Sequence, residues 1–407
     1  MRELLSVAEA RRTVLAAVTW VQPVEHVPLA DALGRTLAEP VVSRDAIPPF
    51  DNSAMDGFAV RTADFDGGTA TLRVIGEAAA GRMPDVVVEP GTCVRIMTGA
   101  PIPAGADAVA PVEWTEPDGD RVLIGRAPTA GQYVRPAGQD VQPGDTMAKT
   151  GTVVTPPVVG MAATLGFAEL AVRVPPRVAV VATGDELVPA GAALRAGHVR
   201  DANGPALAAQ VVAAGGTVVG PLHARDDADD ARRVLGVALD ADVVVVSGGV
   251  SMGEYDVVRD VLDALGVTWA FWRVRQRPGK PLAFGTRPRG RGGDTLVFGL
   301  PGNPVSSAVC FEQYVRPALA ALLGRSATVR TVPAVLAEDV AKQAGLHHFV
   351  RGLAEHDADG RLRVRPTGAQ ASNLYSSVLR ADVLIHLPEA IEDPAVGTPV
   401  EVEWLRW

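Results

Sequence analysis

Three short segments of the 407-residue chain combine glycines with polar side chains that carry hydroxyl, amide or carboxylate groups. They are residues 183–186 (TGDE), 247–254 (SGGVSMGE) and 299–307 (GLPGNPVSS). Glycine lets the backbone approach a ligand closely, and a helix that starts behind such a loop offers N–H groups to phosphate. Ordinary strand-to-helix turns use the same residues, so one loop alone would mean little. Three such loops together predict a binding site for a phosphate-bearing ligand.

Carboxylates accompany these glycines, at Asp185, Glu186, Glu254 and Asp256. Bare carboxylates repel an anionic ligand unless a cation lies between them. A hard divalent ion such as Mg²⁺, coordinated by carboxylate and phosphate oxygens, resolves this conflict. The alternative is that some of them only cap helices, which suits Asp256 in particular.

Other polar segments are less specific. Residues 275–281 (RQRPGKP) concentrate positive charge but lack the GxxxxGK[ST] pattern of a nucleotide P-loop. They are either an anion site or a solvated basic hairpin. In the N-terminal half, residues 50–60 (FDNSAMDGFAV), 95–101 (RIMTGAP) and 135–140 (RPAGQD) are, by physical reasoning alone, turns and surface pairs.

The elements that must position the three loops are apolar runs at 178–181, 243–246 and 296–298. Runs without polar alternation are typical of strands buried on both faces. Segments of helical period lie between them, at 205–214, 227–239 and 255–265, and Pro304 is placed to start another helix. This alternation predicts a doubly wound α/β domain with a mostly parallel sheet, whose ligands bind beyond the carboxyl ends of the strands.

The rest of the chain divides by composition into flanking domains. Residues 1–40 are expected to be helical with a break at 21–23, and residues 142–172, with a helix near 157–165, to fold back on them as one discontinuous helical and linker domain. Residues 41–141 are expected to form a mixed β domain of short strands. The α/β domain spans 173–323. Residues 324–407, with strands at 361–365, 383–387 and 400–404, are expected to form a small β-barrel or sandwich.

Composition excludes several classes of protein. The formal charge of −9 argues against nonspecific binding to nucleic acid or to an anionic membrane surface. No stretch has the roughly 18 apolar residues of a membrane span, and the N-terminus has no signal-like apolar region. Cys93 and Cys310 stand alone, without zinc-site spacing. We therefore expect a cytoplasmic protein in a reducing compartment.

Taken together, the motifs closely resemble the molybdopterin molybdenumtransferase family, which includes bacterial MoeA proteins and the E domain of gephyrin. The matching strings are PPFDNSAMDGFAV, RIMTGAPIPAGADAV, RPAGQD, VATGDELVPAG, SGGVSMGEYD, RPGKPLAFG, GLPGNPVSS and PTGAQASNLYSS. They occur in the family's order from residue 48 to 377, so the resemblance covers nearly the whole chain.

The resemblance implies an elongated homodimer of four-domain subunits, with a cleft between domains of opposite subunits. It also implies insertion of molybdenum from molybdate into adenylylated molybdopterin, with release of AMP, assistance from Mg²⁺ and contact with a molybdopterin adenylyltransferase. Residues that would act in catalysis are Glu186, Asp256, Asp56, Asp140 and Lys280, and Glu186 and Asp256 would also bear on the metal. Ligand-binding positions would be Thr98, Arg135, Thr183, Gly184, Asp185, Ser247, Gly248, Gly249, Ser251, Pro281, Pro301, Gly302, Asn303, Ser306, Arg351 and Ser372.

Within that set the resemblance assigns regions. Asp56, Thr98, Arg135 and Asp140 would be contributed across the dimer, whereas Lys280, Pro281, Ser306, Arg351 and Ser372 would line the molybdate pocket. A dianion would be neutralised by Lys280 and Arg351.

One residue departs from the family's pattern, and one pair of histidines could suggest a metal site. Arg277 stands where many members have Lys, so a planar fork replaces a point charge. The paired His347 and His348 would point to opposite faces of a strand, which favours packing or solvation over metal binding.

Two other functions compete with the transferase. An adenylyltransferase acting one step earlier shares the α/β domain, but the extra domains at 1–172 and 324–407 count against it. A non-catalytic scaffold is the other, and the sequence contains no partner-binding linker of the kind that such a role would use.

Overall fold

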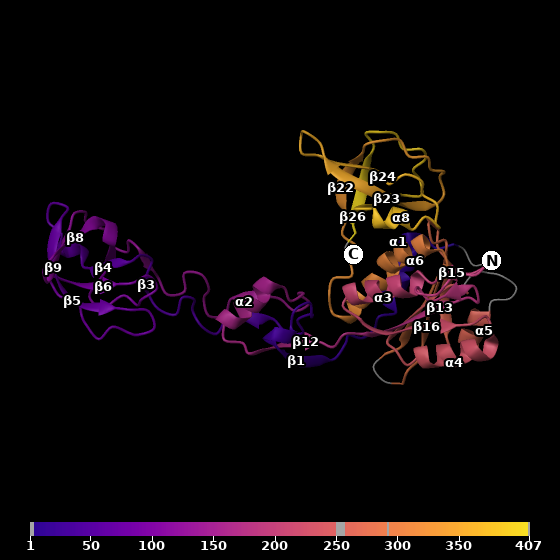
Figure 1. Cartoon of the computed structure of the whole chain (residues 1–407), viewed down its shortest axis with the longest axis horizontal. Helices are drawn as coiled ribbons and strands as arrows, with labels where there is room; N and C mark the ends of the chain where they lie inside the picture. Colours follow the sequence, from indigo (N-terminus) through magenta and orange to yellow (C-terminus); the bar gives the residue numbers. More distant parts are fainter. Residues whose placement is uncertain (1–3, 250–256, 291–292, 406–407) are drawn as a thin grey trace. The chain divides into compact units, whose positions relative to one another are not determined.

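The computed structural model describes residues 4–249, 257–290 and 293–405. The chain forms two compact units (Figure 1). The first consists of Met1–Glu39, Thr150–Thr155 and Glu169–Trp407, and the second of Pro40–Lys149 and Pro156–Ala168. The boundaries expected for four domains, at 1–40 with 142–172, 41–141, 173–323 and 324–407, stay predictions.

A six-stranded, mostly parallel sheet forms the centre of the first unit, as expected. Only β20 runs antiparallel to its two neighbours. The strands that precede the glycine loops are adjacent, in the order β13, β17, β21, and are almost wholly buried. Across the sheet the order is β16 (Thr217–Ala224), β13 (Arg177–Thr183), β17 (Val243–Ser247), β21 (Thr295–Leu300), β20 (Pro281–Arg287) and β18 (Thr268–Arg273).

Helices cover both faces of this sheet (Figure 1). Alternate residues of β17 explain why: Val243 and Val245 belong to one hydrophobic cluster, and Val244 and Val246 to the other. The first cluster is covered by α1 (Val7–Ala16), α3 (Asn203–Ala213), α6 (Pro304–Cys310), the π-helical turn Phe311–Val315 and α7 (Arg316–Leu322), and the second by α4 (Ala228–Ala238) and α5 (Val257–Ala264). The sheet domain is therefore doubly wound.

The helix boundaries follow local signals. The α4 helix starts behind Asp227, whose side chain accepts hydrogen bonds from the N–H groups of Asp229 and Asp230. Pro304 begins α6, as expected. The α5 helix begins at the edge of the undescribed segment 250–256, so its expected start at 255 cannot be compared.

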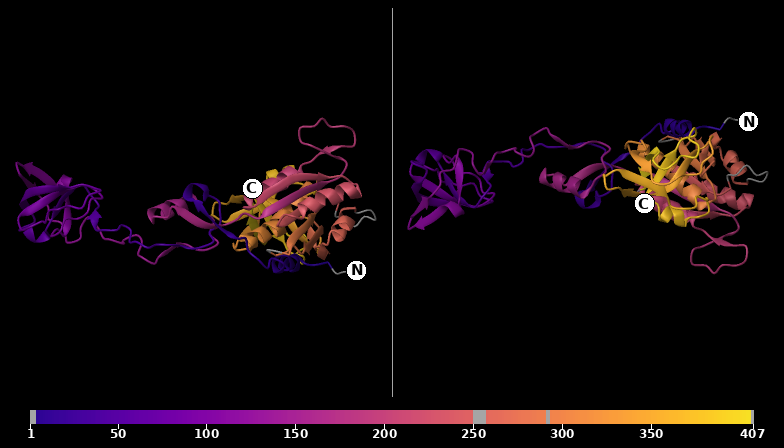
Figure 2. Two further views of the ribbon diagram at one scale, coloured as in Figure 1. Left: turned by 90° about the horizontal axis from the view of Figure 1, so that it is seen from below. Right: turned by 90° about the horizontal axis from the view of Figure 1, so that it is seen from above.

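The N-terminal segment is less helical than the sequence predicts. The α1 helix carries a Ser6–Glu9 capping box and packs against the sheet domain (Figure 2), but it ends at Ala16. Beyond it, β1 (Val24–Pro28) pairs antiparallel with β12 (Glu169–Arg173), followed by a 3₁₀ turn at Leu29–Asp31. The expectation of helix up to residue 40 is therefore wrong. Prolines interrupt the helix, and the strand partner comes from a distant part of the sequence.

The second unit is a curled sheet of short strands with small apolar clusters on its two faces. The strand order is β7 (Ala108–Pro111), β4 (Gly57–Val60), β6 (Thr92–Ile96), β5 (Ala70–Ala78), β9 (Arg121–Ile124) and β8 (Thr115–Asp118). Two short pairs join β3 (Asn52–Ser53) to β10 (Val134–Arg135) and β2 (Val41–Val42) to β11 (Thr146–Ala148). The 3₁₀ turns Thr62–Asp64 and Val112–Trp114 and the helix α2 (Pro156–Thr164) complete the unit.

The C-terminal region is a closed barrel, one of the two architectures expected for it. Its five strands are β22 (Val332–Leu336), β23 (His347–His356), β24 (Leu362–Pro366), β25 (Val383–Leu387) and β26 (Pro399–Trp404). Pairing of β23 with both β24 and β25 closes the ring. A short strand, β19 (Gln276–Arg277), lies beside β23, and α8 (Ser376–Leu379) precedes β25. The strand β22 was not predicted, and β23 was expected only as a strand at His347 and His348.

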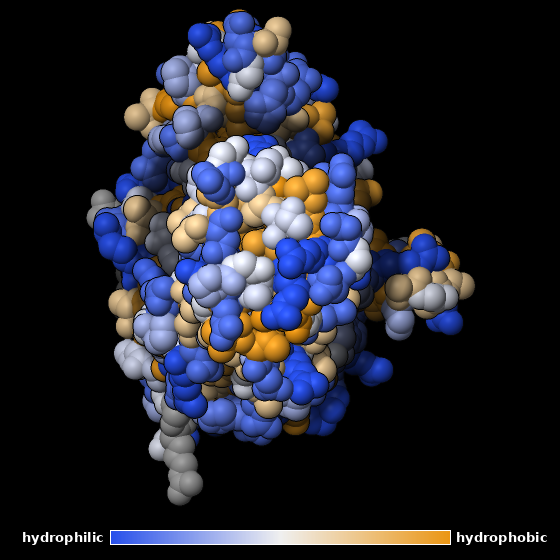
Figure 3. Space-filling view, turned by 90° about the vertical axis from the view of Figure 1, so that its left-hand side faces the viewer, coloured by the Kyte–Doolittle hydropathy of each residue, from blue (hydrophilic) through white to orange (hydrophobic). Residues whose placement is uncertain are grey.

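No helix in the described part of the chain is long and apolar enough to cross a membrane. On the face drawn in Figure 3, apolar residues form small patches separated by hydrophilic ones. Singly exposed apolar residues of this kind are normal for a protein surface.

Candidate functional site

A cavity of about 900 Å³ opens at the carboxyl ends of β13, β17 and β21. The three glycine-containing loops predicted to meet there all contribute to its lining. From the predicted set, the residues that line it are Thr183, Gly184, Glu186, Ser247, Gly248, Gly249, Pro281, Pro301, Gly302 and Asn303. The strand order of the sheet brings these residues together from four parts of the sequence, the three loops and Pro281 at the start of β20.

The loop after β17 requires its glycines. Gly248 and Gly249 have φ angles of 93° and 61°, in the left-handed region that disfavours other residues. A Cβ atom on Gly248 would lie 2.7 Å from Thr183 Oγ1, and one on Gly249 would lie 2.5 Å from Val258 Cγ2. The backbone of this loop can thus stay close to β13, α5 and any ligand in the cavity.

Carboxylates lie along the loop after β13. Glu186 and Asp226 line the cavity. Asp185 and Asp226 each accept a 3.3 Å hydrogen bond from the backbone N–H of the other. His223 Nε2 lies 2.9 Å from the carbonyl oxygen of Gly184, which adds a further restraint on this loop.

This donor set fits a hard cation only in part. No group of three or more His, Cys, Asp or Glu side chains that could hold a metal occurs among the described residues. Mg²⁺ commonly needs only one or two carboxylates when phosphate oxygens and water complete its shell. Glu186 is suited to that role, while Asp256, the other predicted ligand, and Ser251 lie outside the described residues.

The basic segment 275–281 contains an ordered turn whose Arg277 and Lys280 side chains are exposed. Gln276 is fully buried, and its Nε2 donates to the carbonyl oxygens of Pro278 and Gly279 at 3.2 and 3.1 Å. Lys280 is exposed and Pro281 lines the cavity. Gln276 therefore holds the turn that presents Lys280 beside the cavity.

Arg351 is a buried cation in the C-terminal barrel, with 1% of its surface exposed. Its Nε donates to Ser377 Oγ at 3.1 Å and its Nη2 to the carbonyl oxygen of Ala371 at 3.2 Å. Within the described residues no carboxylate forms an ion pair with it. Burial, and then the nearby Arg277, lower the pKa of Arg351 to about 10. It stays charged at neutral pH, so the site favours an anion.

The segment that contacts Arg351 is linked to the cavity. Asn303 Nδ2 donates to Ser372 Oγ at 3.0 Å, and Ala371 adjoins Ser372. Ser306 is buried in the first turn of α6 and does not line the cavity.

Of the four predicted residues in the second unit, Asp56 and Thr98 are in direct contact. The Asp56 carboxylate accepts hydrogen bonds from the N–H and hydroxyl of Thr98 at 2.6 and 2.8 Å. These bonds, the backbone one first, lower the pKa of Asp56. Arg135 pairs with Asn52 across β10 and β3, and the Asp140 N–H donates to Ile47. Direct contact between Asp56 and Thr98 was not evident from their spacing.

The paired histidines pack, as expected. His347 stacks near Phe349, with ring centroids 4.5 Å apart, and meets His386 edge-on. Burial, followed by His386, lowers the pKa of His347 to about 3. The His347 ring is therefore part of the barrel's packing.

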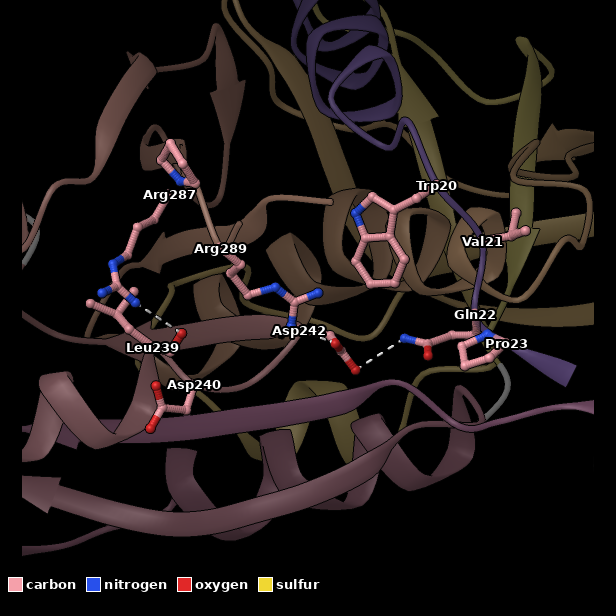
Figure 4. Close-up of a pocket in the computed structure, with 10 residues that line it drawn as sticks. Trp20, Val21, Gln22, Pro23, Leu239, Asp240, Asp242, Arg287 and Arg289 are labelled. Carbon is pink, nitrogen blue, oxygen red and sulfur yellow. Dashed lines mark hydrogen bonds and ion pairs between the residues drawn. The ribbon is translucent and has the colours of Figure 1, made fainter. Parts of the chain in front are cut away.

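A second cavity, of about 790 Å³, lies at the opposite, amino-terminal edge of the sheet (Figure 4). The Asp242 carboxylate accepts from Gln22 Nε2 at 3.0 Å, from Arg289 at 2.6 Å and from the Arg177 N–H at 2.7 Å. The Arg289 guanidinium also lies 5.1 Å from the Trp20 ring centroid. These contacts attach the segment after α1 to the sheet, which is a structural role.

Sequence reasoning missed Asn203, Asp226 and Gln276. At the start of α3, Asp201 accepts a hydrogen bond from the Gly204 N–H, while the Asn203 side chain faces the loops. The local signal for Gln276 was an uncharged polar residue within the basic segment RQRPGKP.

Comparison with known proteins agrees with this architecture. Three family models match in order: MoeA N-terminal region (domain I and II) over residues 5–166, "Probable molybdopterin binding domain" over 179–321, and MoeA C-terminal region (domain IV) over 333–405. A crystal structure of the molybdopterin biosynthesis MoeA protein from Pyrococcus horikoshii aligns with a TM-score of 0.83 and 28% identity. The alignment covers 99% of this chain and 100% of that one.

Curated relatives match over nearly their whole length. Molybdopterin molybdenumtransferase 2 of Mycobacterium tuberculosis H37Rv is 38% identical over 408 residues, 98% of each chain. Molybdopterin molybdenumtransferase of Haemophilus influenzae is 33% identical over 410 residues, again 98% of each. The chain is thus an enzyme of molybdenum cofactor biosynthesis. The chain belongs to the molybdopterin molybdenumtransferase family.

Proposed function

We propose that this enzyme inserts molybdenum from molybdate into adenylylated molybdopterin and releases AMP. The observation that carries this proposal is Arg351, a buried guanidinium without a carboxylate partner among the described residues. A buried cation of this kind is costly unless an anion compensates it. Molybdate, a dianion substrate, has the charge and the hydrogen-bond acceptors that the site lacks.

The cavity beside it suits the second substrate. The glycine loops after β13, β17 and β21 bring the backbone close to the cavity, and Ser247 and Thr183 add hydroxyls to its lining. In the reaction the phosphoanhydride bond to AMP breaks and a new P–O bond forms, with oxygen from molybdate or from water. Molybdenum then becomes bound to the dithiolene sulfurs. Labelling molybdate or water with ¹⁸O distinguishes the two sources.

Charged groups near the cavity support this chemistry. Lys280, exposed beside it, can neutralise negative charge that develops as AMP leaves. Glu186 would hold Mg²⁺ together with substrate oxygens, and Asp256 would join it. When bound, Mg²⁺ would act as a Lewis acid toward the phosphates.

We further infer, from the family's pattern, a cytoplasmic homodimer in which Asp56, Thr98, Arg135 and Asp140 complete the partner's site. The same pattern suggests that an adenylyltransferase delivers the adenylylated substrate.

The decisive experiment measures AMP release from adenylylated molybdopterin by the purified protein with Mg²⁺, with and without molybdate. Molybdate-dependent release that yields active cofactor is the expected result. Turnover of ATP on molybdopterin would instead identify an adenylyltransferase. Substrate binding without release would identify a non-catalytic binding protein.

A further inference from the structure

Asn203, the first residue of α3, connects two of the loops that form the cavity. Its Nδ2 atom donates to Ser247 Oγ at 2.8 Å and to the carbonyl oxygen of Gly302 at 2.7 Å. A carbonyl oxygen can only accept, so the amide nitrogen must be the atom that faces Gly302. Both N–H groups of the side chain are therefore used within the protein.

The two partners belong to different strands of the sheet. Ser247 ends β17, and Gly302 lies between β21 and α6. Ser247 Oγ also lies 3.3 Å from Ser307 Oγ and 3.4 Å from the carbonyl oxygen of Pro301. Asn203 thus holds the ends of β17 and β21 at a fixed spacing from α3.

This connection matters because glycine loops lose much conformational freedom when they become ordered around a ligand. Loops already ordered in the free protein reduce that cost at the moment of binding. Gly248, Gly249 and Gly302 line the cavity immediately beside the two atoms that Asn203 contacts.

The helix does not need Asn203 for its own start. Asp201 Oδ1 accepts from the Gly204 N–H at 2.9 Å, which satisfies a free donor of the first turn. Helix capping and loop attachment are therefore carried by two different side chains.

We propose that Asn203 is a positioning residue, which orders the β17 and β21 loops so that they hold the phosphate-bearing substrate. The inference rests on the proposed function, since it assigns that substrate to this cavity. Asn203 need not touch the reacting atoms.

The test compares Asn203→Asp with the control Asp201→Ala. The substitution at Asn203 keeps the size of the side chain but turns a carboxylate oxygen toward the Gly302 carbonyl. We expect KM for adenylylated molybdopterin to rise about tenfold, because one strong hydrogen bond is worth roughly that factor. Because the loops lose their conformational entropy when the substrate binds and not in the chemical step, kcat should change much less.

The control should behave in the opposite way. Asp201→Ala removes the hydrogen bond to the Gly204 N–H but leaves both contacts of Asn203, so it should lower the thermal midpoint and leave KM unchanged. An unchanged KM in Asn203→Asp, or an equal rise in the control, would overturn the proposal.

Hydrogen–deuterium exchange without ligand separates this inference from the proposed function. Amides at 248–249 and 302–303 should exchange faster in Asn203→Asp than in the wild type, and unchanged exchange would reject the positioning role. If wild-type protein fails to bind adenylylated molybdopterin, the proposed function fails, and with it the substrate named here.

Discussion

At the scale of single residues, Arg351 is expected to lower the stability of the free protein while it contributes to binding. A buried guanidinium that, among the described residues, donates to Ser377 and to the Ala371 carbonyl and has no carboxylate partner is a costly group in the free protein. It is retained, we infer, because an anionic substrate compensates it. If so, replacing Arg351 should weaken molybdate binding without lowering the free energy of unfolding.

Arg351→Met should reduce molybdate affinity at least about tenfold, the factor that corresponds to one lost charge-assisted hydrogen bond. Its free energy of unfolding should stay within about 1 kcal/mol of the wild type or exceed it, because removal of a buried charge is often stabilising. Molybdate titration by calorimetry and urea unfolding measure the two effects. Arg365→Met, an exposed position on β24, is the matched control. Equal molybdate affinity in the Arg351 variant would remove Arg351 from the anion site.

Among the described carboxylates, Glu186 is the best candidate ligand for Mg²⁺. Glu186→Gln keeps the size of the side chain but removes the charge that attracts Mg²⁺. Mg²⁺-dependent AMP release should fall strongly while the circular dichroism spectrum and thermal midpoint stay those of the wild type. Glu401→Gln, exposed on β26, controls for loss of a surface charge. Undiminished turnover would exclude Glu186 from the mechanism.

At the scale of elements, Asp242 fixes the N-terminal segment to the amino-terminal edge of the sheet. Its carboxylate accepts from Gln22, Arg289 and Arg177, and the Asp242 and Arg289 side chains are each only 15% exposed. Removal of the Asp242 carboxylate breaks its ion pair with the mostly buried Arg289 guanidinium.

Asp242→Ala should therefore lower the free energy of unfolding by about 2–3 kcal/mol, somewhat less than the cost of breaking a fully buried pair. Urea unfolding measures this change. Asp240→Ala removes an exposed carboxylate that lines the same cavity, and it should cost little. Equal decreases in the free energy of unfolding in the two variants would show that the change in net charge, and not the contacts of Asp242, is responsible.

At the scale of the whole molecule, the family's pattern predicts that each active site uses residues of two subunits. Asp56→Ala and Glu186→Gln should each be inactive as homodimers. Mixed under conditions of subunit exchange, they should recover part of the AMP-release activity, because a heterodimer contains one site with both native residues. Native mass spectrometry would establish the exchange. Exchange without recovery would refute the shared site.

The sequence by itself determined the central sheet, its helices and the loops at one edge. Apolar runs such as 243–246 mark strands buried on both faces, and the ends of adjacent parallel strands meet at one edge whatever the remaining contacts are. The strand Val383–Leu387 was predicted to the residue for a similar reason, because its apolar run is local.

Only the tertiary structure decided the features that depend on distant partners. β1 is a strand because β12 pairs with it, and the barrel closes because β23 pairs with β25. Arg351 is buried without a carboxylate partner among the described residues because the barrel places it beside Ser377 and Ala371. Asn203 connects two loops because the fold places Ser247 and Gly302 within hydrogen-bond distance. Hydrogen bonds and ion pairs act over a few ångströms, so their partners are fixed by the folded chain and not by local sequence pattern.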